Sequence, residues 1–287
     1  IFLFFISLIS LFLVPFVGIE VKGSKRWIDL FFLPRFQPIE VLKPFLIIIL
    51  ATIFCDIRSN ILFKYLISII LISVISLLLI AQPDIGQTLL VVFCWAALIF
   101  TSGINIYILL AIFIVGASLL AYLIIFVPKF DYIQGRIFSF FNRETGTHNF
   151  QSDKAIESIT SGGFFGKGIG EGVLKNRVPE AHTDYIISVI SEEFGVVAIM
   201  LILLLFLILI YMVFKKISFE TNDKAKLILI GSISLILMQA TIHIGVNIRL
   251  FPTTGMTLPF LSYGGSSIIS TSILAGIILN LTKRKIT

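Results

Sequence analysis

Long apolar runs alternate with polar segments along the whole chain, and the runs have the length of membrane spans. A helix needs roughly 17 to 25 mainly apolar residues to cross a bilayer. Because an open sheet would leave backbone groups without partners in lipid, each run is predicted to be a helix in a packed bundle. Eight runs fit this pattern, at about residues 1–17, 38–55, 62–81, 86–102, 105–127, 185–214, 227–249 and 266–282.

Three hydrophilic segments separate these runs, at 18–43, 128–184 and 249–267. A structureless connection longer than about 15 residues is uncommon unless it is functional or disordered. Counting Lys and Arg over all loops does not decide the orientation, but their concentration in very short loops and in the tail "KRK" (283–285) favours cytoplasmic chain ends. The three long segments then face outward, and we expect the function on that face.

Composition agrees with a membrane protein and excludes a soluble domain. Of the 287 residues, 57% are hydrophobic and 13% charged, and the mean hydropathy is +1.06. Cys55 and Cys94 lie in apolar runs without metal-ligand or disulfide spacing, so both are interpreted as small core residues. The chain opens with "IFLFFISLIS", inside an apolar run and without Met, so we expect that it belongs to a longer protein.

Ionisable groups crowd the entrance to the sixth run, in "VPEAHTDYIISVISEEFG" (178–195). If a helix begins near Thr183, one of its faces carries a descending polar stripe of Asp184, Ser188, Ser191 and Glu192. Carboxylates at membrane depth are costly and usually functional. The alternative is that Thr183 or Asp184 only caps the helix.

The glycine-rich segment "SGGFFGKGIGEGVLKNR" (161–177) combines close backbone approach with the cations Lys167 and Lys175. Glycine lets backbone N–H groups surround an anion. It is not a P-loop, because Gly168 follows Lys167 where Ser or Thr is required. A flexible surface loop is the alternative.

Two further segments place charges beside predicted spans. In "VKGSKRWIDL", Lys25 and Arg26 adjoin a Trp that suits a membrane interface, and in "QPIEVLK" Glu40 stands three residues from Lys43, at ion-pair spacing. The alternative is an interfacial anchor followed by a helix start. Asp84 of "AQPDIGQTLL" is predicted to cap a helix.

The last two spans carry uncharged polar groups. Gln239, His243 and Asn247 recur at i+4, which favours a hydrogen-bond seam over a metal site. The segment "TTGMTLPFLSYGGSS" (253–267) breaks the final span with Gly and Pro, so non-helical backbone is expected there, lining a cavity or the protein interior. Together these features predict an outward-facing cavity with basic groups around one prominent acid, suited to a polyanionic, lipid-attached substrate.

Five motifs in order carry a resemblance that covers essentially the whole chain: "GSKRWI…QPIEVLKP", "QPDIGQTL", "AIESITSGGFFGKGIGEG", "VPEAHTDYIISVISEEFG" and "PTTGMTLPFLSYGGSS". They resemble the SEDS family of cell-wall polymerases, the division, elongation and sporulation proteins FtsW, RodA and SpoVE. "PEAHTD" and the "GEG…K" run are more similar to the division type.

The resemblance implies a single SEDS-type all-α membrane domain over 1–287, a polytopic bundle with about eight of the family's ten spans and without the first two. The segment 128–184 would be periplasmic. Such a protein polymerises lipid II into glycan strands in the bacterial inner (cytoplasmic) membrane, at the division septum. A lipid II flippase, or a non-catalytic scaffold of the division machinery, remains the alternative.

The family's essential aspartate corresponds to Asp184, which the resemblance implies is the general base of an inverting transfer. Cations near the leaving pyrophosphate would offset its charge. A divalent cation, Mg²⁺ or Mn²⁺, is left open, and no protein metal site is expected. The implied partners are lipid II, a class B penicillin-binding protein, other division proteins and membrane lipids, but no nucleic acid. The expected substrate-binding residues are Lys25, Arg26, Glu40, Lys43, Arg136, Lys167, Lys175, His182, Thr183, Glu192, Ser262 and Ser266.

Overall fold

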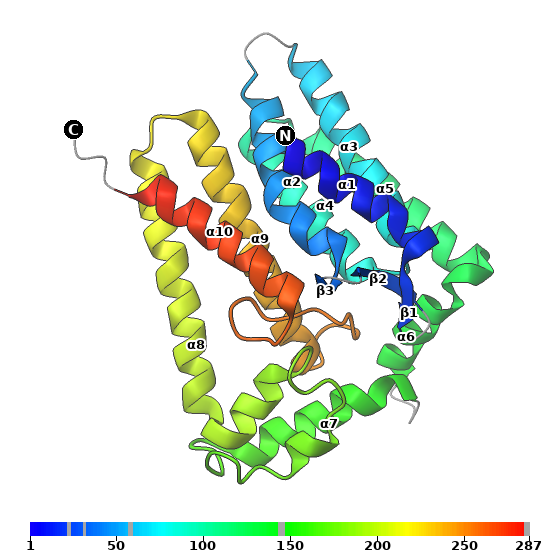
Figure 1. Cartoon of the computed structure of the whole chain (residues 1–287), viewed down its shortest axis with the longest axis vertical. Helices are drawn as coiled ribbons and strands as arrows, with labels where there is room; N and C mark the ends of the chain where they lie inside the picture. The colour runs from blue at the N-terminus through cyan, green and yellow to red at the C-terminus, as the bar shows by residue number, and fades with distance from the viewer. Residues whose placement is uncertain (22–23, 31–32, 57–59, 143–146, 284–287) are drawn as a thin grey trace. The chain divides into compact units, whose positions relative to one another are not determined.

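The computed structural model describes residues 1–21, 24–30, 33–56, 60–142 and 147–283. Arg284 and Lys285 of the basic tail therefore lie outside the described residues. Each of the eight predicted spans coincides with a helix, which confirms the predicted polytopic helical fold (Figure 1). These helices are α1 (Phe2–Val17), α2 (Pro38–Phe54), α3 (Ile61–Ala81), α4 (Ile85–Thr101), α5 (Ile106–Phe126), α8 (Ile186–Phe219), α9 (Asp223–Asn247) and α10 (Gly265–Thr282).

Five of these helices, α3, α5, α8, α9 and α10, are each long and apolar enough to cross a membrane. The helices α1 and α4 are apolar but shorter. The protein is thus a multi-pass membrane protein.

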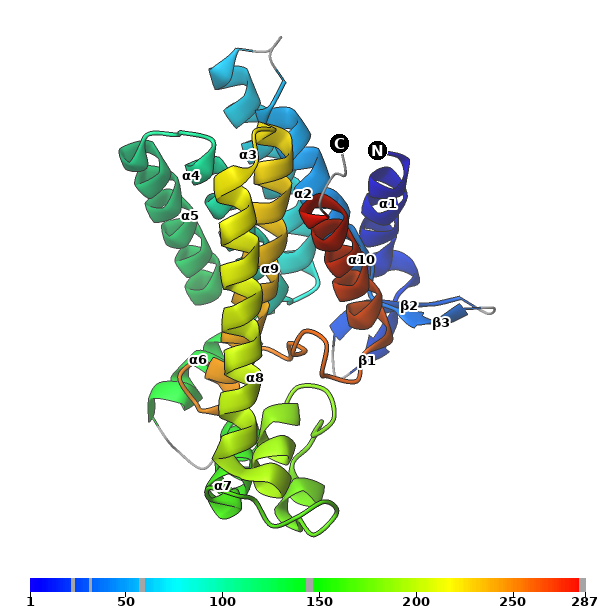
Figure 2. The ribbon, with the colours of Figure 1, turned by 90° about the vertical axis from the view of Figure 1, so that its left-hand side faces the viewer.

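Two polar segments carry structure that the apolar pattern does not reveal. Between α1 and α2 lies a three-stranded antiparallel sheet in the order β1 (Ile19–Val21), β2 (Ser24–Leu30), β3 (Leu33–Phe36), in which β2 and β3 can be followed as neighbours in Figure 2. The segment 128–184 is not a bare loop. It contains η1 (Pro128–Phe130), α6 (Asp131–Asn142), α7 (Thr147–Gly162) and η2 (Leu174–Arg177).

The chain divides into two compact units. The first comprises Ile1–Leu109, Ile210–Met238 and Gly264–Thr287, and the second comprises Leu110–Leu209 and Gln239–Tyr263.

In the first unit, α2 is central and packs against α1, α3, α4 and α10. Pro38 occupies the first turn of α2, where its fixed φ suits a helix and its missing N–H costs nothing. Leu42, Ile47 and Leu50 are almost fully buried on the same helix. Asp84 accepts a hydrogen bond from the Gln87 N–H at 3.3 Å and caps α4, which confirms the predicted cap.

In the second unit, α8 is broken at Gly195, where φ is 74° and ψ −175°. A Cβ at this position would lie 2.2 Å from the carbonyl oxygen of Phe164, so only glycine fits. The helix also begins at Ile186, later than the predicted start near Thr183. The carbonyl of Glu180 accepts the N–H groups of the three residues 183–185, and this turn delays the helix.

Candidate functional site

Asp184 lies in the turn directly before α8, in the second unit, and its side chain is half-buried. The helix starts two residues later, so Asp184 is not part of it. The other residues of the predicted stripe, Ser188, Ser191 and Glu192, lie on α8 and are all buried. A Cβ placed on Gly255 would stand 3.3 Å from Asp184 Oδ2. The carboxylate therefore lies against the backbone of Gly255, whose φ of 69° favours glycine.

The polar stripe of α9 holds this segment in place. Gln239 Nε2 donates to the Thr257 carbonyl at 3.0 Å, and His243 Nδ1 lies 2.7 Å from the Met256 carbonyl. Asn247 Nδ2 donates to the backbone carbonyl of Asp184 at 3.0 Å. The three side chains are buried, and the predicted hydrogen-bond seam is confirmed. Helix α9 therefore holds both the turn at Asp184 and the segment 255–257, which lies against the Asp184 carboxylate.

Ser262, His182 and Thr183 belong to the same assembly. Ser262 Oγ donates to the Thr183 carbonyl at 2.6 Å and accepts the Leu258 N–H at 2.7 Å. The Tyr263 N–H donates to the His182 carbonyl at 2.9 Å. The side chain of His182 is exposed, and that of Thr183 donates to Glu180. The backbone is non-helical from 253 to the end of this unit at 263, as predicted, and hydrogen bonds from Ser262 and Tyr263 join it to the turn before α8.

Arg136 on α6 lies in the same unit and acts on Tyr185, the residue after Asp184. Its Nη1 donates to the Thr253 carbonyl at 2.7 Å. Burial raises the pKa of Tyr185, which precedes α8, and the negative Asp184 raises it further, while Arg136 lowers it. The acid and the guanidinium therefore act on one and the same phenol. Arg136 also lines a small pocket together with Ser139, Ser152 and Thr253.

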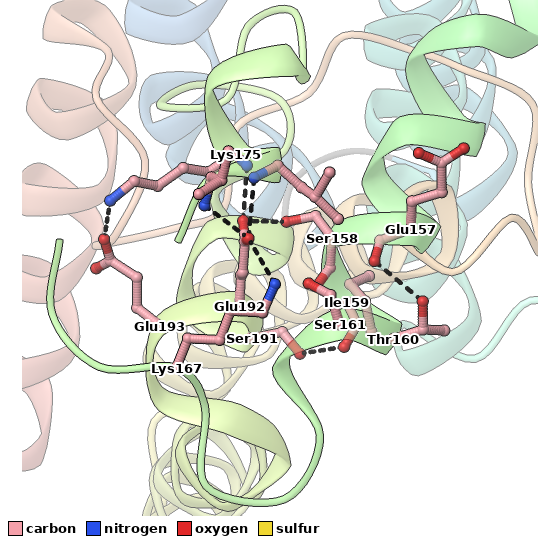
Figure 3. A network of polar contacts seen from close by, with 12 residues as sticks. Glu157, Ser158, Ile159, Thr160, Ser161, Lys167, Lys175, Ser191, Glu192 and Glu193 are labelled. Atoms are coloured by element: carbon pink, nitrogen blue, oxygen red, sulfur yellow. Dashed lines mark hydrogen bonds and ion pairs between the residues drawn. The ribbon is translucent and has the colours of Figure 1, made fainter. Parts of the chain in front are cut away.

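The glycine-rich loop places its cations beside glutamates of α8 (Figure 3). Lys175 Nζ forms an ion pair with Glu193, and Lys167 Nζ stands 3.5 Å from Glu192 Oε1. Backbone N–H groups of the same loop donate to the buried Glu192 carboxylate. The loop N–H groups and lysines that the sequence suggests for binding an anion thus contact the carboxylates of Glu192 and Glu193.

The first unit holds the remaining candidates. Lys43 Nζ donates to Glu40 Oε1 at 2.8 Å, which confirms the predicted ion pair, and both side chains are buried. Gln87 bridges them: it accepts from Lys43 at 3.2 Å and donates to Glu40 at 2.6 Å. Ser266 Oγ accepts the Gln37 N–H at 2.9 Å.

Arg26 and Lys25 lie on β2. Arg26 donates to the carbonyl oxygens of Gln82 and Pro83, and its Nε lies 3.7 Å from Asp84 Oδ2. Burial raises the pKa of Asp84, and Arg26 opposes that rise. Lys25 is exposed. Among the described residues there is no group of three or more His, Cys, Asp or Glu side chains that could hold a metal ion.

The candidates therefore divide into two sets. The second unit brings together Asp184, Arg136, Lys167, Lys175, His182, Thr183, Glu192 and Ser262, and the first unit holds Lys25, Arg26, Glu40, Lys43 and Ser266. Sequence reasoning missed Gln87 and Ser158, which donate hydrogen bonds to Glu40 and Glu192. Their partners are far away in sequence, and no local spacing indicates them.

Comparisons with known proteins agree over almost the full length of the chain. Residues 1–286 match the family of cell cycle proteins FtsW, RodA and SpoVE. The probable peptidoglycan glycosyltransferase FtsW of Caulobacter vibrioides is 34% identical over 279 residues, which are 95% of this chain and 69% of that protein.

Two solved structures are similar in fold. A chain from a peptidoglycan synthase complex, studied for its structural coordination of polymerization and crosslinking, has a TM-score of 0.75 and 27% identity, with coverage of 98% of this chain and 79% of that one. The rod shape determining protein RodA of Thermus thermophilus has a TM-score of 0.67 and 31% identity, with coverage of 98% and 75%.

Proposed function

Because this chain belongs to the FtsW, RodA and SpoVE family, we propose that it is a peptidoglycan glycosyltransferase that polymerises lipid II into glycan strands during cell division. The observation that carries the proposal is one acid, Asp184, held in irregular backbone by the buried seam of α9. The curated relative of Caulobacter vibrioides, a probable peptidoglycan glycosyltransferase, supports the same activity.

In the proposed reaction, the 4-hydroxyl of one sugar attacks the anomeric carbon of another and displaces lipid pyrophosphate with inversion. The hydroxyl proton passes to the carboxylate of Asp184, which acts as general base. The electrons of the broken C–O bond leave with the pyrophosphate, and a nearby cation offsets the developing charge. We assign this role to Arg136, because its guanidinium and the Asp184 carboxylate both act on the phenol of Tyr185.

The proposed setting follows from the apolar helices and the family. The chain acts as one membrane domain in the bacterial inner membrane, with the segment 128–184 on the periplasmic side. It works at the division septum with lipid II, membrane lipids, a class B penicillin-binding protein and other division proteins. The similar chain in a peptidoglycan synthase complex supports a transpeptidase partner.

The activity is tested by reconstituting the protein in lipid vesicles with lipid II and the penicillin-binding protein. We expect glycan chains longer than the disaccharide unit from the wild type and none from Asp184→Asn protein purified in the same way, which excludes a contaminating polymerase. Transfer of lipid II across the bilayer without any glycan product would contradict the proposal and indicate a flippase.

A further inference from the structure

The carboxylate of Glu192 is fully buried and accepts hydrogen bonds from three backbone N–H groups, the Ser158 hydroxyl and, at 3.5 Å, Lys167 Nζ (Figure 3). It accepts the backbone N–H groups of Val173 at 3.0 Å, Leu174 at 2.9 Å and Lys175 at 2.6 Å. The hydroxyl of Ser158 on α7 donates to it at 2.9 Å. Hydrogen bonds to an ionised acceptor are about twice as strong as neutral ones. The residue thus joins α7, α8 and the loop between them.

A second set of hydrogen bonds joins the loop to α8 at the break in this helix. The break at Gly195 frees backbone groups that an unbroken helix would pair internally. The loop takes them over: Lys167 N–H donates to the Glu192 carbonyl at 2.9 Å and Gly168 N–H to the Glu193 carbonyl at 3.0 Å. In return the N–H groups of Val196 and Val197 donate to the carbonyls of Gly163 and Phe164, at 3.0 and 3.3 Å.

These contacts matter because the loop 163–175 has little regular structure of its own. Its backbone is fixed by bonds to α8 rather than by a helix or strand ladder. Glu193 contributes less, since its partly exposed carboxylate accepts one backbone N–H, from Gly170, and pairs with Lys175 Nζ. The buried carboxylate of Glu192 binds three consecutive N–H groups at the point where the loop enters η2.

We propose that Glu192 is a positioning residue that clamps the loop 163–175 to α8 and thereby fixes where Lys167 and Lys175 stand. Its role in the reaction rests on the proposed glycosyltransferase function, whereas the clamp itself does not. Glu192 contacts no reacting atom in this scheme, because its oxygens are occupied by the loop and Ser158.

The clamp is tested with Glu192→Gln, which keeps the shape but replaces one acceptor oxygen by an NH₂ group facing N–H donors. We expect amide hydrogen exchange in 163–175 to become about tenfold faster or more, while α9 stays protected. Trypsin should cut at Lys167 and Lys175 in the variant sooner than in the wild type. Glu157→Gln, which alters an exposed pair on α7, is the matched control and should leave both measurements unchanged.

A second variant reaches the same carboxylate from the loop. A Cβ on Gly172 would lie 3.0 Å from Glu192 Cδ and 3.2 Å from Oε2. Gly172→Ala should therefore displace the carboxylate and loosen the loop without changing the charge. Hydrogen exchange in Gly172→Ala protein therefore measures the same contact if Glu192→Gln does not fold.

Kinetics separate positioning from catalysis and from bulk stability. We expect Glu192→Gln to raise KM for lipid II by about tenfold and to lower kcat less, since the chemistry at Asp184 is untouched. Asp184→Asn should do the reverse, abolishing turnover while loop exchange stays slow.

A loosened loop with unchanged KM would overturn the positioning role, and unchanged loop exchange in both Glu192→Gln and Gly172→Ala would overturn the clamp. Turnover retained by Asp184→Asn would overturn the assigned base alone.

Discussion

At the scale of single residues, the buried ions Glu40, Lys43 and Glu192 each contact a small and specific set of partners. The pair of Glu40 and Lys43 is readable from sequence, because the two residues are one helical turn apart. The participation of Gln87 is not readable, because it depends on how α4 packs against α2. The position of Glu192 on one face of α8 with Ser188 and Ser191 also follows from helical spacing. The loop N–H groups that donate to its carboxylate cannot be predicted in this way.

Removing one partner of the buried pair should be costly. Lys43→Met leaves Glu40 without its cation, and breaking a buried pair in this way typically costs about 3–5 kcal/mol. We expect a clear fall in the thermal unfolding temperature in detergent, partly restored in the double variant Lys43→Met with Glu40→Gln. Lys154→Met, in an exposed pair, is the control and should cost no more than about 1 kcal/mol. Equal effects of the two lysine variants would contradict the account.

Tyr185 gives a prediction that depends on pH. Burial and the negative Asp184 raise its pKa above the usual 10.0, so the folded state holds the phenol proton more tightly than the unfolded state. Its contribution to stability is therefore complete below the usual pKa and is lost as the pH rises above it. The hydroxyl is buried and has no hydrogen-bond partner among the described residues.

Tyr185→Phe should accordingly change unfolding stability at neutral pH by no more than about 1 kcal/mol. The decline in stability above pH 10 should become shallower than in the wild type. Unfolding in detergent across that pH range measures both effects. An alkaline decline as steep as that of the wild type would show that this phenol does not contribute.

At the scale of elements, the break in α8 is the feature that organises the second unit. Its apolar pattern predicts one long span, and the helix indeed continues to Phe219. The break itself, like the sheet β1–β3 and the helices α6 and α7, comes from contacts between segments that periodicity does not encode. The sequence indicates helices wherever an apolar run must satisfy its own backbone in lipid, and it indicates little in polar segments where alternatives exist.

Gly195→Ala tests the break. The alanine would have to adopt a positive φ with an extended ψ, which is essentially restricted to glycine and costs about 1–3 kcal/mol. Its Cβ would also meet the Phe164 carbonyl at 2.2 Å. Gly163→Ala is the control, because its φ of 58° is also positive while its Cβ meets no atom within 4 Å. We expect Gly195→Ala to lower the unfolding temperature well below that of Gly163→Ala. Similar temperatures would mean that the close approach of loop and helix is not tight.

At the scale of the whole molecule, a strongly apolar chain confines its chemistry to a few polar segments. Each predicted span is a helix, and the acid singled out by the sequence lies in a turn held by the α9 seam. The sequence could not show which cations gather near that acid, because this depends on the tertiary arrangement. Arg136 acts in the surroundings of Asp184, whereas the loop lysines are paired with glutamates.

The most direct test of the account is whether the carboxylate at position 184 performs the proton transfer. Asp184→Asn preserves size and polarity but cannot accept a proton at the reacting hydroxyl. With reconstituted protein, penicillin-binding partner and lipid II, we expect the rate of glycan formation to fall by at least about 10²-fold. Loop exchange and unfolding temperature should remain those of the wild type. Glycan formation at the wild-type rate by correctly folded Asp184→Asn protein would contradict the central claim.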